Sequence, residues 1–423
     1  MRKILFFLLQ IMSCLPYVYA QEATPIDSSK RAIGALIVQT GEKKTWSVYN
    51  PERGYFQKAF TDVGDPRFMI ANEDETFKFG IGGFVNVIGL FDFNGMIELS
   101  DFVTSQIPVP MGSEKGQFRL GAESSRFNIK VVGKPKKGTV ITYIEADFHG
   151  ANNLLLLRHA YISYFGFTIG QTWSTFMDLE AGPPTIDFEG PNTQISIRQP
   201  MIRYSHDLTE KLSFSVALEM NTPLVYDYNS IDIEHQRFPN LPLNFKYKDK
   251  FGHLQLAAIA RPMNYYDDTL SYKSITELGY GIALSGKFNL PKKFYIYFQG
   301  VYGKGIAQYI QDLSFSNLDL VLDPDRVGRL KTMPTYGAYL AFQKDWLDNL
   351  YSAIIYGYTA LTGPHAHEAS HLFAHTHYAA VNLFWDPIPY GTIGIEYLFG
   401  RRVNQSGKSA NANRVDFMFR YRF

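Results

Sequence analysis

The chain contains almost no cysteine. Its only thiol among 423 residues belongs to Cys14, close to the amino terminus. If the first twenty residues are removed during export, the mature chain has no thiol, which excludes a disulfide framework and cysteine chemistry. The mature chain must therefore fold without covalent cross-links.

Long apolar runs and a strong net charge are also missing. No run of eighteen apolar residues follows the amino terminus, and the mean hydropathy is −0.15 although 46% of the residues are hydrophobic. These values exclude a bundle of membrane helices. The net charge of +1 argues against nucleic acid as a partner, because phosphate binding requires a large basic excess.

The amino terminus has the pattern of a secretory signal peptide over residues 1–20. Arg2 and Lys3 precede an apolar core from Ile4 to Met12, and Ala20 ends a cleavage site of small residues. The core is too short to span a membrane, which takes roughly twenty apolar residues. A competing lipoprotein-type cleavage would leave a lipidated Cys14.

The final stretch of the chain alternates between apolar and charged residues. Val415, Phe417, Phe419, Tyr421 and Phe423 alternate with Arg414, Asp416, Met418, Arg420 and Arg422. Such a strand would be an aggregation hazard in a soluble sheet, whereas in a membrane barrel its two faces meet lipid and water. The aromatic carboxy-terminal residue resembles an assembly signal of bacterial barrels, so Phe423 is expected to engage the outer-membrane assembly machinery.

The same alternation continues from Phe77 onward and predicts sixteen strands. The predicted strands are 77–93, 117–133, 138–149, 156–166, 167–177, 197–207, 211–221, 241–249, 252–264, 277–288, 292–305, 334–345, 349–361, 373–385, 391–401 and 412–423. Their connections are alternately long and short, which is typical of a membrane barrel and not of a two-sheet sandwich. The predicted fold is all-β, a sixteen-stranded antiparallel transmembrane β-barrel spanning residues 76–423, with long extracellular loops and short periplasmic turns.

Residues 21–75 show neither heptads nor regular alternation, and prolines interrupt them at Pro25, Pro51 and Pro66. We interpret this stretch as a periplasmic amino-terminal segment or a partial plug.

A barrel of sixteen strands leaves an aqueous channel in its middle. The sequence thus predicts a pore in the outer membrane of a Gram-negative bacterium.

Several motifs in the first half of the barrel resemble the DcaP-like family of outer-membrane porins. They are Phe79-Gly-Ile-Gly-Gly-Phe84, Thr142-Tyr-Ile-Glu-Ala-Asp-Phe148, Leu157-Arg-His-Ala-Tyr161, Gly170-Gln-Thr-Trp-Ser-Thr-Phe176, Asp187-Phe-Glu-Gly-Pro191 and Arg198-Gln-Pro-Met-Ile-Arg203. The resemblance implies a homotrimer of sixteen-stranded barrels that admits small anionic solutes such as dicarboxylates. It also implies a coiled-coil segment at the amino terminus. Residues 21–75 show no heptad repeat that would support this feature.

The connection 178–196 is the predicted constriction loop. Asp178, Glu180, Asp187 and Glu189 lie there among glycines and prolines. Such a rigid acidic insertion can fold into the lumen and narrow the pore. The alternative is an external loop whose charges keep it soluble.

Basic side chains on the strands are predicted to line the pore opposite this loop. The set is Arg119, Arg158, Arg198, Arg203 and Arg261. Alternation places Arg203 and Arg261 inside the barrel. Arg158 alternates in step with residues expected on the outer face, so it can point inside only if its strand contains a bulge. Arginine binds carboxylates with two prongs, so the set predicts an anion-preferring filter. The alternative is a set of ion pairs with Glu123, Glu145 and Asp147 that stiffen the wall.

Half of the ten histidines lie close together: His365, His367, His371, His375 and His377. They could form a surface metal site, or an exposed, pH-sensitive loop. A non-conducting surface barrel that binds metal or a partner is therefore the alternative function.

Catalysis is not expected. Strand direction and the alternation of side chains do not bring His149, His159, Asp147 and Ser163 to one spot. The favoured function is a passive, cofactor-free diffusion channel.

Overall fold

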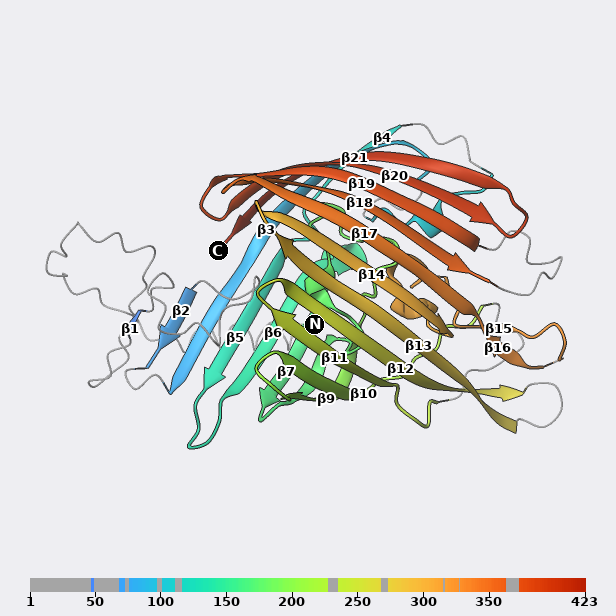
Figure 1. Cartoon of the computed structure of the whole chain (residues 1–423), viewed down its shortest axis with the longest axis horizontal. Helices are drawn as coiled ribbons and strands as arrows, with labels where there is room; N and C mark the ends of the chain where they lie inside the picture. Colours follow the sequence, from blue (N-terminus) through green and yellow to red (C-terminus); the bar gives the residue numbers. More distant parts are fainter. Residues whose placement is uncertain are drawn as a thin grey trace, which may run out of the picture. The chain divides into compact units, whose positions relative to one another are not determined.

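The computed structural model describes residues 47–48, 68–72, 76–96, 101–110, 116–226, 235–267, 273–314, 316–326, 328–362 and 373–423. These residues form a closed antiparallel barrel of sixteen strands (Figure 1), so the predicted fold class is confirmed. The predicted signal peptide and most of residues 21–75 lie outside the described residues. None of the helices in the described part of the chain has the length and apolarity to span a membrane.

Two groups of strands make up the wall. The first group is β3 (Phe77–Asn94), β4 (Gln117–Gly121), β5 (Arg126–Gly133), β6 (Val140–Gly150), β7 (Leu154–Tyr164), β8 (Phe167–Trp173), β9 (Arg198–Asp207), β10 (Leu212–Glu219) and β11 (Leu241–Asp249). The second is β12 (Gly252–Asp267), β13 (Lys273–Leu290), β14 (Phe294–Lys304), β17 (Pro334–Leu347), β18 (Leu350–Leu361), β19 (Phe373–Ile388), β20 (Gly391–Asn404) and β21 (Ser409–Arg422). β4 and β5 both pair with β3 and share one position in the wall, so the predicted strand 117–133 is interrupted.

The barrel closes where the last strand meets the first. β21 pairs with β3 from Asn413 to Arg422, and Phe423 exchanges two backbone hydrogen bonds with Gly83, at 3.2 and 3.0 Å. Gly83 has a positive φ, and a Cβ atom there would collide with the backbone of Arg126. The carboxy terminus thus seals the seam.

Short strands extend this sheet beyond the barrel. β2 (Phe68–Ala71) pairs with the first residues of β3, Lys78 to Ile81, and β1 (Ser47–Val48) pairs with β2. A separate hairpin of β15 (Leu320–Leu322) and β16 (Leu330–Thr332) belongs to a loop. The sheet therefore begins within the predicted amino-terminal segment.

Side chains alternate between the two faces of the wall as the sequence pattern predicts. On β12, Leu254 and Leu256 are exposed on the outside, while Gln255 and Ala257 are buried inside. On β21, Phe417 and Phe419 face outward and Arg414 is fully buried in an ion pair with Asp92. The charged face of this strand is therefore only partly in water, because loops cover much of the inner wall.

Five connections of the barrel are much longer than the others. The long ones are 95–116, 174–197, 220–240, 305–333 and 362–372, and the short ones include 165–166, 208–211, 250–251, 291–293 and 348–349. The strand ends that the long ones join all lie at one end, which is the outer end of a bacterial barrel. The connections expected at 150–155, 265–276 and 402–411 are shorter than predicted, at 151–153, 268–272 and 405–408, because the flanking strands extend further.

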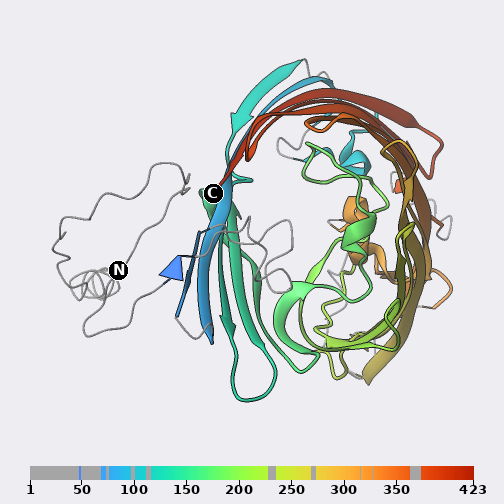
Figure 2. The ribbon, with the colours of Figure 1, turned by 60° about the vertical axis from the view of Figure 1, so that its left-hand side comes forward.

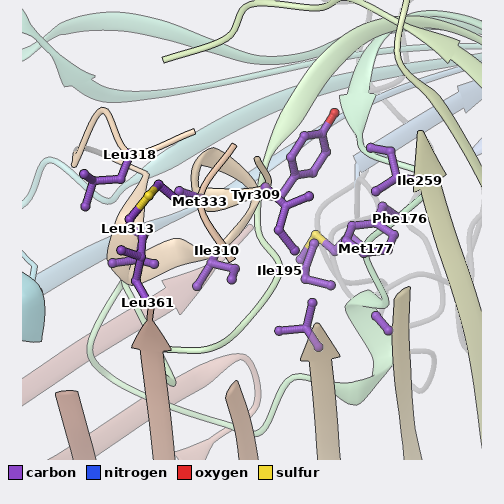
Figure 3. Packing of buried hydrophobic residues seen from close by; sticks show 14 of the residues in the cluster. Phe176, Met177, Ile195, Ile259, Tyr309, Ile310, Leu313, Leu318, Met333 and Leu361 are labelled. Atoms are coloured by element: carbon purple, nitrogen blue, oxygen red, sulfur yellow. The ribbon is translucent and has the colours of Figure 1, made fainter. Parts of the chain in front are cut away.

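Three long connections fold into the barrel (Figure 2). They carry the short 3-10 helices η2 (Thr104–Gln106), η4 (Leu179–Ala181), η5 (Ala307–Tyr309) and η6 (Gln311–Leu313). Phe176, Ile195 and Tyr309 pack there against Ile259 and other apolar residues of the wall (Figure 3). The interior thus has a dry half, filled by loops, and an open half.

Candidate pore and its basic wall

The open half of the barrel contains a cavity of about 1220 Å³. Its wall consists of residues from β3, β5, β6, β7, β8, β9 and β21, and loops 95–116, 174–197 and 305–333 complete the lining. Six basic side chains line the cavity: Arg126, Lys130, Arg158, Arg198, Arg420 and Arg422. Four carboxylates line it as well: Asp101, Glu145, Glu180 and Glu189. Basic groups therefore predominate on the strands, and acidic groups lie mostly on the loops.

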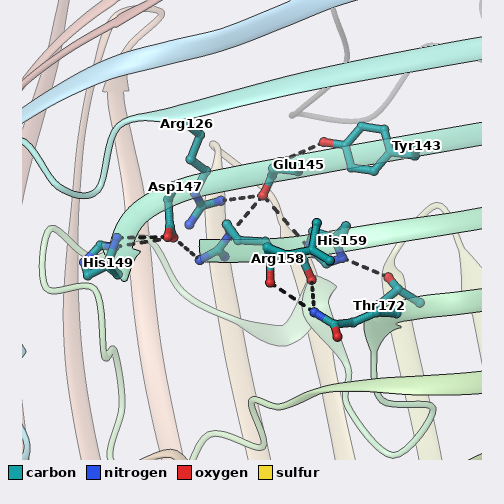
Figure 4. Close-up of polar contacts among 10 residues, drawn as sticks. Arg126, Tyr143, Glu145, Asp147, His149, Arg158, His159 and Thr172 are labelled. Atoms are coloured by element: carbon teal, nitrogen blue, oxygen red, sulfur yellow. Dashed lines mark hydrogen bonds and ion pairs between the residues drawn. The ribbon is translucent and has the colours of Figure 1, made fainter. Parts of the chain in front are cut away.

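A bulge in β7 brings Arg158 to this wall. Glu145 pairs with His159 but the next residue, Ala146, pairs with Leu157, so Arg158 is the extra residue between them. A bulge can turn a side chain toward the face of the sheet opposite to the one that regular alternation predicts. Arg158 accordingly points inside, where its Nε donates to Glu145 at 2.9 Å and its Nη1 to Asp147 at 2.6 Å (Figure 4).

Further polar contacts hold these two carboxylates in place. Tyr143 donates its hydroxyl to Glu145 at 2.7 Å, and Arg126 lies 3.7 Å from the same carboxylate. His149 lies 3.4 Å from Asp147 and stacks on Phe188 of loop 174–197, with 4.3 Å between ring centroids. The loop thus meets the basic wall through an aromatic ring.

The residues considered for catalysis do not form a catalytic group. His159 Nδ1 lies 3.1 Å from the hydroxyl of Thr172, whereas Ser163 contacts Thr168 and the carbonyl of Phe167 near a short turn. A nucleophile and its base must be within hydrogen-bond reach of each other. In the described part of the chain, Ser163 is not within hydrogen-bond distance of His149 or His159.

Three arginines of the cavity have no carboxylate within ion-pair distance among the described residues. Arg198 lies over the ring of Trp173, with its guanidinium carbon 4.8 Å from the ring centroid. Arg420 donates from Nε to the side-chain oxygen of Asn86 at 3.1 Å, and Arg422 follows it on the same face of β21. None of the three charges is therefore neutralised by an ion pair within the described part of the chain.

The other predicted arginines lie elsewhere in the interior. Arg119 on β4 pairs with Glu123 at 2.9 Å. Arg203 lies on the far side of loop 174–197, in a smaller cavity of about 350 Å³. Arg261 is completely buried and pairs with Asp319 of loop 305–333 at 3.0 Å. The structure therefore brings Arg158 and Arg198 together, and separates Arg119, Arg203 and Arg261 from them.

The first two acidic residues of the predicted constriction loop bind basic side chains of the wall. Asp178 lies 2.8 Å from His253 Nε2 and accepts a hydrogen bond from Lys246 at 2.9 Å. Glu180 accepts one from Lys248 at 2.8 Å. Burial alone would raise the pKa of Asp178, but the contacts with His253 and Lys246 outweigh it, so its pKa is lowered. Asp178 thus remains charged and anchors the loop.

Asp187 and Glu189 are buried where the loop reaches the opposite wall. Glu396 of β20 accepts hydrogen bonds from the backbone amides of Ile186 and Asp187, at 2.9 and 2.8 Å. Burial raises the pKa of Asp187. Burial and the charges of Asp101 and Asp187 raise the pKa of Glu189 well above its usual value. Both carboxylates are thus buried and not exposed in the pore.

The predicted filter set leaves out four basic residues of the cavity: Arg126, Lys130, Arg420 and Arg422. The signal that could have revealed them was the alternation itself. Arg126 and Lys130 alternate with Phe127 and Ile129, and Arg420 with Phe419 and Tyr421. Parity alone would have placed all four inside.

Only the last part of the histidine cluster can be located. His365, His367 and His371 lie outside the described residues. His375 and His377 lie on the outer face of β19, with 5.5 Å between their ring centroids. Within the described part of the chain, no group of three histidine, cysteine or acidic side chains is arranged to hold a metal ion.

The comparisons with known proteins agree on one type of protein. The family model described as DcaP outer membrane protein matches residues 63–423. The crystal structure of the outer membrane channel DcaP of Acinetobacter baumannii superposes with a TM-score of 0.73 at 22% identity, covering 82% of this chain and 97% of that chain. A search among curated proteins found no match.

More distant porins share the fold. An anion-selective porin from Comamonas acidovorans superposes with a TM-score of 0.54 at 10% identity, covering 82% of this chain and 100% of that one. The trimer form of OmpT of Vibrio cholerae gives a TM-score of 0.53 at 10% identity, with the same coverages. At these identities the likeness concerns the barrel and not the solute.

Proposed function

Because the chain belongs to the DcaP family of outer membrane proteins, we propose that its barrel is a passive channel for small hydrophilic anions, such as dicarboxylates. The family and the structural neighbours are outer-membrane channels and porins of Gram-negative bacteria. The preference for anions and the class of solute are the parts that we add. Passage would require neither a cofactor nor a catalytic step.

One observation carries the proposed selectivity. Arg198, Arg420 and Arg422 line the cavity, and no carboxylate of the described residues is in ion-pair contact with them. By contrast, Arg158 is neutralised by Glu145 and Asp147, and the acids of the loop are buried or bound to lysines. An anion that enters therefore meets three guanidinium groups whose attraction local partners do not cancel, and the low-dielectric wall strengthens that attraction.

Two carboxylates on one solute fit this arrangement. Arg420 and Arg422 lie on β21, while Arg198 begins β9 on another part of the same cavity. Each guanidinium can bind a carboxylate with two parallel hydrogen bonds. A dicarboxylate could thus engage two sites in succession, and weak binding at several sites is what conduction requires.

We also propose a homotrimer that forms through the wall of short strands. Ile162, Ile169 and Ile202 occupy one cross-strand row on β7, β8 and β9, and each is about half exposed on the outer face. Leu218 of β10 continues the row. A contiguous aliphatic row supports a contact between subunits, as does the trimer form of a structural neighbour.

The remaining parts of the chain fit an exported protein. We propose that residues 1–20 are a signal peptide, that residues 21–75 lie in the periplasm and that Phe423 is read by the assembly machinery. In support, β2 pairs with the end of β3 that lies beside the short turns, which is the periplasmic side.

The proposal is tested by neutralising the three unpaired arginines. The variant Arg198→Gln/Arg420→Gln/Arg422→Gln should shift the reversal potential in a tenfold KCl gradient toward cations by on the order of 10 mV, where perfect selectivity gives about 59 mV. Lys344→Gln is the control, because Lys344 is only partly exposed, lies near a short turn and does not line the cavity. An unchanged reversal potential would remove these arginines from the filter. A wild-type protein that never conducts would instead favour a non-conducting surface barrel.

A further inference from the structure

A cationic and aromatic cluster lies on the outer face of the barrel, away from the pore. It consists of Tyr336, Tyr358, His375, His377 and Arg401, and we refer to it as the rim cluster. These residues come from four neighbouring strands, β17 to β20. Tyr358 is the register partner of His377, and His377 is the partner of Arg401, so their side chains stand in one row across the wall.

Alternation shows that this row points away from the lumen. Thr376 and Tyr378, which flank His377, are fully buried inside the barrel. Arg401 is exposed, and His377 is partly exposed on the opposite face. The guanidinium group therefore lies on the side of the wall that faces the membrane.

The height of the cluster follows from strand geometry. Trp385 lies on the outer face of β19 near the short turns and is exposed, as an interfacial tryptophan would be. His375 is ten residues away, about 34 Å along the strand and about 26 Å across the membrane at a tilt of roughly 40°. The apolar band of such barrels is about 25 Å tall. The rim cluster is thus at the level of the outer-leaflet headgroups.

The cluster carries positive charge that the protein does not balance. In the described part of the chain, no carboxylate lies within ion-pair distance of Arg401, which donates from Nη2 to Ser409 at 3.3 Å. His377 uses Nδ1 for a contact of 2.8 Å with the hydroxyl of Tyr356, and this contact fixes the ring. Most guanidinium donors of Arg401 and the Nε2 atom of His377 are therefore available to an anion.

Apolar residues lie directly below the charged row. Leu340, Ile354 and Val381 are exposed on the same face of β17, β18 and β19, nearer the middle of the wall. A ligand that satisfies both zones must have an anionic head and hydrocarbon chains. A free anion would use only the upper zone.

We propose that the rim cluster binds a phosphate group of the outer-leaflet glycolipid, lipopolysaccharide, with its acyl chains on the apolar residues below. The guanidinium of Arg401 matches the geometry of a phosphate, and the two imidazoles add donors beside it. The contact would hold one lipid against the wall formed by the long strands β17 to β20. This polar surface differs from the purely aliphatic row on β7 to β9. The site is independent of the channel, so neither proposal depends on the other.

Native mass spectrometry of the full-length protein can test this, with EDTA present to exclude bridging by metal ions. The probe is lipid A with both phosphates, compared with dephosphorylated lipid A. We expect a bound lipid on the wild type, at least tenfold weaker binding to Arg401→Gln/His375→Gln/His377→Gln, and unchanged binding to the control Lys344→Gln. Dephosphorylated lipid A should bind each protein equally weakly.

A second variant separates phosphate recognition from charge alone. Arg401→Lys keeps the positive charge but loses the planar fork, so its binding should fall between the wild type and the triple variant. Heat-modifiable migration on gels verifies that each variant is folded. Equal binding of lipid A to the wild type and the triple variant would overturn the proposal. So would equal binding of the dephosphorylated lipid, or complete displacement by millimolar inorganic phosphate, which would indicate a free-anion site.

Discussion

Arginines inside the barrel differ in their partners and hence in their roles. Arg158 is buried between Glu145 and Asp147, so its charge is used within the wall. Arg198 lies over the ring of Trp173, and none of the described carboxylates is in ion-pair contact with it. A side chain of the same type is thus part of an ion-pair network in one place, while in another we propose that it attracts a solute.

Removing the guanidinium of Arg158 should destabilise the barrel. Arg158→Ala leaves two buried carboxylates without their partner, a change that costs about 3–5 kcal/mol. The thermal transition, followed by the heat-modifiable shift on gels, should move to a clearly lower temperature. Arg119→Ala is the matched control, since its partly exposed pair with Glu123 is worth about 1 kcal/mol or less. Equal transition temperatures for the two variants would contradict this role.

Alternation could indicate which face a residue occupies, but not its partners. It predicts an inward Arg203 and an inward Arg261, and the structure places both there. It could not show that Arg261 pairs with Asp319, because that contact joins a strand to a distant loop. It also left Arg158 undecided, since a bulge depends on the pairing register and has no signature in the alternation.

At the scale of elements, the loops determine how much of the barrel is open. Loop 305–333 is held by Asp312, which is buried and accepts hydrogen bonds from the hydroxyls of Thr104 and Thr376, at 2.9 and 3.0 Å. It thereby ties three distant parts of the chain together. Burial raises the pKa of Asp312 to about 6.

This raised pKa predicts that the loop is held more firmly in acid. A carboxyl group whose pKa is raised in the folded state stabilises the fold below its unfolded pKa, and the stabilisation is lost as pH rises through about 6. Hydrogen exchange in loop 305–333, corrected for intrinsic rates, should therefore be roughly tenfold slower at pH 4 than at pH 7. Asp312→Asn should flatten this dependence, while the exposed Asp325→Asn should not. The same dependence in both variants would count against Asp312.

The positions of the long and short connections along the chain were predictable from the sequence, whereas the paths of the long loops inside the barrel were not. Alternating long and short connections follow from strand lengths and turn residues, which are local signals. The path of loop 174–197 depends on contacts such as Thr193 with the carbonyl of Tyr358 at 2.6 Å, across the barrel. No local pattern encodes that contact.

At the scale of the whole molecule, the barrel has two unlike halves. Apolar loops fill the interior beside the long strands β12 to β20, and a water-accessible, basic cavity lies beside β3 and β5 to β8. Closure by β21 on β3 brings Arg420 and Arg422 to this cavity. The predicted ring of strands with an aqueous middle is thus an accurate outline, while the asymmetry of the interior arises from the folded loops.

The most direct measurement is the current through the wild-type protein in a planar bilayer with a KCl gradient. We predict ohmic single channels that close in three equal steps, with a reversal potential on the anion side of zero. A protein that stays silent, or one whose reversal potential lies on the cation side, would contradict an anion-preferring pore.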